Sequence, residues 1–141
     1  MAKLLAYTIA LFFVLPAPSY ACDAIHRLDP NRGKLIEDCM KRDVEELKKG
    51  LPTKLDHITT FESANLFGKL VTYEYTLDVS KEEAIRRQIV VQTKSKLKEY
   101  MCANQPFAFL IENDVKYGYV YSDKNANIIG HFVVDKHLCG F

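Results

Sequence analysis

Five tyrosines are the side chains with the most regular spacing in this sequence. They stand at alternate positions in two short segments, as Tyr73 and Tyr75 and as Tyr117, Tyr119 and Tyr121. In a β-strand this spacing places the rings of each segment on one face of the sheet. In one interpretation the rings are packed under helices, with cross-strand pairs worth about 0.2–1 kcal/mol each. In the other they form a partly exposed aromatic surface that binds a peptide, glycan or protein.

A second candidate group lies near the C-terminus and consists of His131, Asp135 and His137. If the last strand continues through Leu138, these three side chains share one face, and sets of imidazole and carboxylate groups bind zinc. A small metal-dependent hydrolase is therefore an alternative function. Val133 shares the same face and no fourth ligand is evident, so we favour surface residues on an edge strand and expect no metal or cofactor.

Motifs of nucleophilic catalysis and of phosphate binding are missing from the sequence. It has no G-x-S-x-G elbow and no glycine-rich phosphate loop. Glu74 lies on a strand face away from the tyrosines and has no evident partner, and the Arg86-Arg87 pair is most simply a solvated helix face. We therefore expect no catalytic residues and no enzyme.

The first 21 residues have the parts of a secretory signal peptide. Lys3 supplies a positive charge, residues 4–15 form an apolar run, and Ser19 and Ala21 place small residues before a cleavage site after Ala21. The apolar run is shorter than the roughly 20 residues that span a bilayer. A lipoprotein that begins at Cys22 is the competing interpretation, but bulky Tyr20 precedes that cysteine and argues against it.

The cysteines agree with export to an oxidising compartment. All four follow the cleavage site, and an even number in an exported chain predicts disulfides. Four cysteines allow three pairings. The order of the predicted elements favours Cys22–Cys39 and Cys102–Cys139, which would contribute about 3 and about 4 kcal/mol by the loop-closure relation. A bridged Cys22 would not be lipidated.

The chain that remains after cleavage, residues 22–141, has the size of one domain. It contains 18 basic and 18 acidic residues, and this neutral balance gives no reason to expect nucleic acid as a partner. No later segment is apolar enough to span a membrane.

The hydrophobic periodicity predicts seven elements. Apolar residues at helical spacing predict a helix from about Asn31 that ends at Gly50, and Ser80 with Glu83 forms a capping box that opens a second, long helix. The full order is α-β-β-α-α-β-β, an α+β two-layer sandwich in which an antiparallel four-stranded sheet carries its helices on one face. The predicted segments after the first helix are 55–65 and 70–78 (strands), 80–101 and about 104–111 (helices), and 116–122 and 127–135 (strands).

The C-terminal two thirds of the sequence, about residues 55–141, resembles a family of small secreted bacterial proteins, the quorum-sensing-regulated virulence factors of pseudomonads and their relatives. The resemblance implies a two-layer fold, secretion and no assigned catalytic residues. The matching features are Gly68-x-Leu70-x-x-Tyr73-x-Tyr75 on a strand, a long helix that ends at Cys102, Pro106 at the start of a short helix, Tyr117-x-Tyr119-x-Tyr121-x-Asp123 on a strand, and Cys139 near the end.

Together these features predict a small binding, accessory or virulence-associated protein in the periplasm or the medium. Its partner would be a protein or another macromolecule of the envelope or the extracellular space. The alternative within the same class is an inhibitor or immunity protein against a toxin or enzyme. The oligomeric state does not follow from the sequence.

Overall fold

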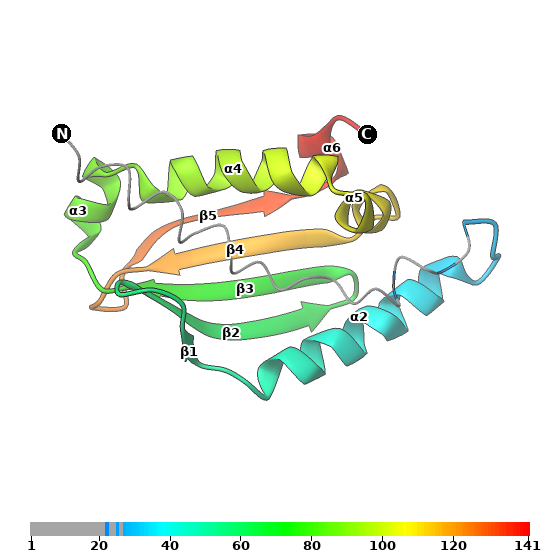
Figure 1. Ribbon diagram of the computed structural model, residues 1–141, viewed down its shortest axis with the longest axis horizontal. Coiled ribbons are helices and arrows are strands. Elements are labelled where there is room, and N and C mark those ends of the chain that lie inside the picture. Colours follow the sequence, from blue (N-terminus) through cyan, green and yellow to red (C-terminus); the bar gives the residue numbers. More distant parts are fainter. Residues whose placement is uncertain (1–21, 23–24, 26) are drawn as a thin grey trace.

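The computed structural model describes residues 22, 25 and 27–141, so the expected signal peptide and its cleavage site lie outside the described residues. One five-stranded sheet runs through the molecule, in the order β1-β2-β3-β4-β5 (Figure 1). No helix in the described part combines the length and apolarity that crossing a bilayer requires. The elements are α2 (Arg32–Lys48), β1 (Thr53–Lys54), β2 (Thr59–Phe67), β3 (Leu70–Leu77), α3 (Lys81–Arg86), α4 (Ile89–Ala103), α5 (Gln105–Glu112), β4 (Lys116–Ser122), β5 (Ile128–Val134) and α6 (Lys136–Cys139).

The sheet is mixed, so the prediction of a four-stranded antiparallel sheet is wrong in two respects. β3 and β4 are parallel, whereas the other three neighbouring pairs are antiparallel. Three helices connect β3 to β4 and carry the chain back to the end where β3 began, which a parallel pair requires. The strand that was not predicted is β1. It consists of two residues, both exposed, which are too few to produce an alternating pattern in the sequence.

The first helix agrees with the prediction, but the predicted helix over residues 80–101 is two helices. The Ser80 side chain caps α3 by accepting a hydrogen bond from the Glu83 N–H at 3.2 Å. Gln88 then adopts a left-handed conformation with φ 54° and separates α3 from α4. Ile85, near the end of α3, is 55 % exposed.

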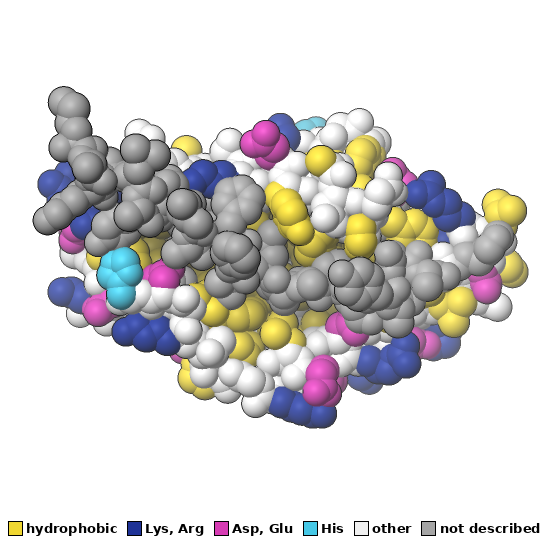
Figure 2. Space-filling model, in the orientation of Figure 1, with side chains coloured by type: hydrophobic (Ala, Val, Ile, Leu, Met, Phe, Trp, Pro, Cys, Tyr) yellow, Lys and Arg dark blue, Asp and Glu magenta, His cyan; other side chains and the backbone are white. Residues whose placement is uncertain are grey.

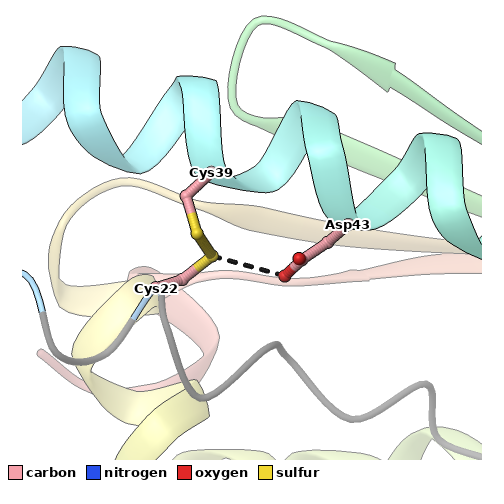
Figure 3. A group of neighbouring side chains, drawn as sticks. All are labelled: Cys22, Cys39 and Asp43. Carbon is pink, nitrogen blue, oxygen red and sulfur yellow. Dashed lines mark hydrogen bonds between the residues drawn. A yellow bond between two sulfur atoms is a disulfide. The ribbon is translucent and has the colours of Figure 1, made fainter.

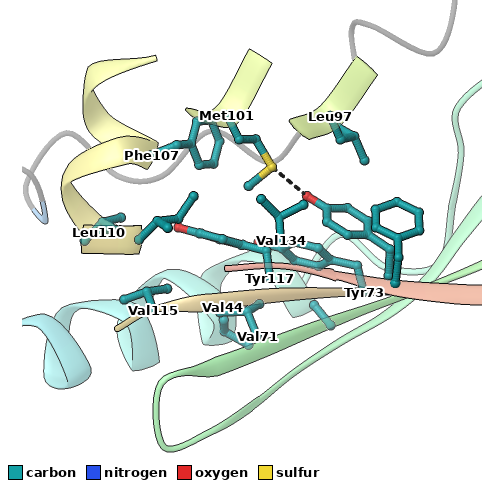
Figure 4. Packing of buried hydrophobic residues seen from close by; sticks show 14 of the residues in the cluster. Val44, Val71, Tyr73, Leu97, Met101, Phe107, Leu110, Val115, Tyr117 and Val134 are labelled. Carbon is teal, nitrogen blue, oxygen red and sulfur yellow. Dashed lines mark hydrogen bonds between the residues drawn. The ribbon is translucent and has the colours of Figure 1, made fainter. Parts of the chain in front are cut away.

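The core lies between the helices and the sheet face that carries the tyrosines. Val44 of α2 and Val71 of β3 belong to the same buried cluster, and Leu97 and Met101 of α4 lie over the rings (Figure 4). The side chains that alternate with the tyrosines on β3, such as Glu74, are exposed or only half-buried. This arrangement places the tyrosine cluster at the centre of the molecule.

Candidate functional site

The five tyrosines form a continuous aromatic layer across the middle strands. Tyr73 pairs with Tyr119 and Tyr75 with Tyr121 across the parallel strands. The ring centroids of these two pairs are 5.5 and 5.0 Å apart. Tyr119 also stacks on Phe132 of β5 at 5.0 Å. The sequence interpretation that placed the rings on neighbouring strands therefore agrees with the register.

The burial of this layer decides between the two sequence interpretations. The five residues Tyr73, Tyr75, Tyr117, Tyr119 and Tyr121 are 1–5 % exposed. Rings so deeply buried pack the core and do not offer a free aromatic surface to a partner. The interpretation of the tyrosine stripe as an exposed binding surface does not agree with this burial, because α2, α4 and α5 contribute side chains to the same cluster.

The tyrosine hydroxyls lie in a nonpolar environment. The Tyr119 hydroxyl donates a hydrogen bond to the Met101 sulfur at 3.3 Å (Figure 4). The Tyr117 hydroxyl has no hydrogen-bond partner among the described residues. Desolvation raises the pKa of all five tyrosines above the ordinary value, and the nearby Asp43 carboxylate adds to the rise of the pKa of Tyr73 and Tyr117. The layer is therefore held in its neutral form.

A buried disulfide beside an acidic side chain is the second polar feature of the core. Cys22 and Cys39 are bonded to one another and are 0 and 3 % exposed. The Cys22 sulfur lies 3.3 Å from an Asp43 carboxylate oxygen (Figure 3). Within the described residues this is the one cluster of three potential metal ligands, but sulfurs joined in a disulfide are not thiolate ligands. Acylation would need the same Cys22 sulfur, so the bridge and a lipid anchor exclude each other.

The sequence analysis predicted both disulfides but missed Asp43. The second bridge, Cys102–Cys139, has the expected pairing, and it joins the end of α4 to α6, a helix that was not predicted. Asp43 stands four residues after Cys39 on α2, and this spacing, which puts two side chains on the same helix face, is the signal that could have found it. Its carboxylate is half-buried.

The histidines and aspartate near the C-terminus do not come together. β5 ends at Val134, and the Asp135 carboxylate caps α6 by accepting a hydrogen bond from the Leu138 N–H at 2.9 Å. The condition for a shared face, a strand that continues through Leu138, is therefore not met. His131 lies on β5 and His137 on α6, so the metal-site interpretation is wrong for these described residues.

Hydrophobic side chains reach the surface on the face of the molecule that bears the helices. Figure 2 shows them gathered along the middle of this face, between α4 and α2. Partly buried residues of both helices, including Leu47 and Ile89, pack against the core.

Comparison with known proteins gives a fold but no family. No family model and no curated protein matches this chain. A candidate secreted protein from Pseudomonas aeruginosa has a similar structure, with a TM-score of 0.61 at 15 % identity over 73 % of this chain and 91 % of that one.

Two pilotins of type II secretion systems are similar to the same extent. The pilotin EpsS from Vibrio vulnificus has a TM-score of 0.60 at 13 % identity, and AspS from Vibrio cholerae has 0.56 at 16 %. Each comparison covers 76 % of this chain and 94 % of the pilotin. At such low identity the likeness shows the fold alone. A quorum-sensing link, which the sequence resemblance implied, finds no counterpart in these comparisons.

Proposed function

We propose that this protein is a small exported accessory protein that binds a protein component of a bacterial secretion or envelope assembly, in the manner of a pilotin. The observation that carries the proposal is the likeness to two type II secretion pilotins over 94 % of their length. Fold alone does not imply function, so the proposal also needs support from the site.

Three features of the site support a binding role. The buried tyrosine layer and the two disulfides make the scaffold rigid. A rigid scaffold lowers the entropy cost of binding. Hydrophobic side chains gather at the surface between α4 and α2 (Figure 2). The described residues bring together no catalytic set, and the proposal assigns the protein no reaction.

We further infer that the protein is exported and acts as a single domain without a lipid anchor. A signal peptide that is cleaved after Ala21 would release a single domain of residues 22–141 into the periplasm or the medium. The Cys22–Cys39 bridge would leave it without a lipid anchor. A role in virulence would follow from the secretion system that it serves.

Affinity purification from the native host tests the function. The mature, oxidised protein, tagged at its C-terminus, is expressed at native level, cross-linked in intact cells and recovered from the envelope fraction. We expect one protein component of a secretion assembly to be enriched over a control that carries the same tag on an unrelated exported domain, and we expect deletion of the gene to reduce secretion. Recovery of a soluble toxin or enzyme in an equimolar complex would instead support an inhibitor or immunity protein. Recovery of no specific protein, with normal secretion in the deletion strain, would refute both.

A further inference from the structure

The edge strand β5 offers unused backbone hydrogen-bonding groups. β5 lies at the end of the sheet and pairs only with β4. Within the described part of the chain, no backbone hydrogen bond joins β5 to any other element. An open strand edge is a template on which another chain can add a strand. Two side chains of β5, Ile128 and Val133, are 58 and 39 % exposed and would flank such a strand.

The helix beside this edge carries cations that lack acidic partners. Between Glu83 and Glu99 the sequence has five basic residues and no acidic one. Arg87 is paired with Glu83, whereas Lys94 and Lys98 are exposed and form no ion pair with any described residue. α4 itself contributes three of these basic residues, Lys94, Lys96 and Lys98, and one acidic residue, Glu99.

The helical geometry places these lysines on the side of α4 that faces away from α5. Tyr100 contacts Phe107 of α5, with ring centroids 6.0 Å apart, and this contact identifies the flank that faces α5. At 3.6 residues per turn, Lys94 and Lys98 fall on the opposite flank, as does Val91, which is 67 % exposed.

α4 also packs directly on β5. A Cβ atom added to Gly130 would lie 3.2 Å from a Val90 methyl carbon. Figure 1 shows α4 beside β5, the last strand of the sheet. Lys94 stands four residues after Val90, so it lies on the same side of α4 as the residue that packs on β5. We define Lys94, Lys98 and the outer edge of β5 as the β5 edge site.

We propose that the β5 edge site binds an extended acidic segment of a protein partner, which adds a sixth strand to the sheet while its carboxylates contact Lys94 and Lys98. The inference rests on the proposed function, because it names the chemistry of the segment that an accessory protein of this kind would recognise. Backbone pairing would supply affinity and the lysines would supply selectivity for acidic sequences. A second copy of this chain is a poorer occupant, because pairing two β5 edges would bring the lysines of both copies together.

Hydrogen exchange with defined peptides tests the inference on the oxidised mature protein. The probe is a synthetic peptide in which Glu and Val alternate, and its control has Lys in place of Glu. We expect only the acidic peptide to bind, to slow amide exchange in residues 128–134, and to bind more weakly as salt is added. K94E/K98E should weaken binding by about tenfold or more. The matched reversal K41E/K48E on α2 should leave it unchanged.

Four binding results would overturn the inference. They are equal binding of the two peptides, binding without protection of residues 128–134, binding of K94E/K98E at wild-type strength, and preferential binding of phosphatidylglycerol vesicles. Sedimentation that showed a dimer broken by K94E/K98E would also contradict it. If a native partner is recovered as described above but binds K94E/K98E normally, the proposed β5 edge site is wrong and the accessory role stands. If the peptide binds as expected and no native partner exists, the accessory role is wrong.

Discussion

The neutral tyrosine layer predicts a steep loss of stability in alkali. Burial raises the pKa of Tyr73, Tyr75, Tyr117, Tyr119 and Tyr121 in the folded protein, whereas an unfolded tyrosine has a pKa of about 10. A raised folded pKa contributes stability that is fully present below the unfolded pKa. It is lost as the pH rises above that value, because the unfolded chain then releases protons that the folded chain retains.

The size of the effect follows from the number of buried hydroxyls. Each tyrosine that ionises only in the unfolded state lowers the free energy of unfolding by about 1.4 kcal/mol per pH unit. Five together remove about 7 kcal/mol by pH 11, relative to neutral pH, and a domain of this size has about 5–15 kcal/mol in total. We expect cooperative unfolding between about pH 10.5 and 12.

Two spectroscopic signals recorded on the same sample provide the assay. Phenolate absorbance reports ionisation and far-ultraviolet circular dichroism reports the fold, in a Tyr100→Phe variant that removes the partly exposed tyrosine of the mature chain. We expect both signals to change together, and both to recover when the pH is lowered again. Tyr121→Phe should move the midpoint to higher pH. Gradual ionisation near pH 10 with unchanged circular dichroism would show that the rings are accessible and would refute the buried layer.

Three further predictions concern stability, measured by denaturant unfolding. Tyr117→Phe removes a buried hydroxyl without a described partner and should stabilise the protein by about 1 kcal/mol, whereas Tyr119→Phe, which loses a hydrogen bond, should not stabilise it. Replacing both Cys102 and Cys139 by Ser opens a loop of sequence separation 37 and should cost about 4 kcal/mol; a loss below about 1 kcal/mol would contradict the chain-entropy argument. Desolvation raises the pKa of Asp123, but hydrogen bonds from its turn outweigh it and lower that pKa. Asp123→Ala should therefore destabilise the protein at neutral pH. The difference in the free energy of unfolding between variant and wild type should shrink as the pH falls through the pKa of the carboxylate. A difference that stays constant with pH would contradict this.

Local patterns predicted the parts of the molecule that depend on local chemistry. The alternation of Tyr73 with Tyr75 placed the rings on one sheet face, and the apolar spacing over α2 placed the first helix. The cysteine pairing followed from the order of the elements. The strand face and the helix are decided by residues within one or two turns or one strand, so a single sequence contains enough information for both.

The features that the sequence did not predict depend on distant or weak signals. The parallel pairing of β3 with β4 is set by the three helices that connect them, and the residues of the two strands show no pattern that would predict it. The long helix is interrupted at Gln88, and the sequence has no glycine or proline there that would predict a break. Whether an alternating aromatic strand faces helices or solvent depends on what packs over it, and that information lies in α2, α4 and α5.

The order of the cysteines along the chain has a consequence for how the protein is made. A chain that crosses a membrane with its N-terminus first presents Cys22, Cys39, Cys102 and Cys139 in that order. The native bridges join the first to the second and the third to the fourth. An oxidase that links each cysteine to the one that emerges next would thus produce the native pairing directly, before the later cysteines could compete. Vectorial oxidation would make a disulfide isomerase dispensable for this protein.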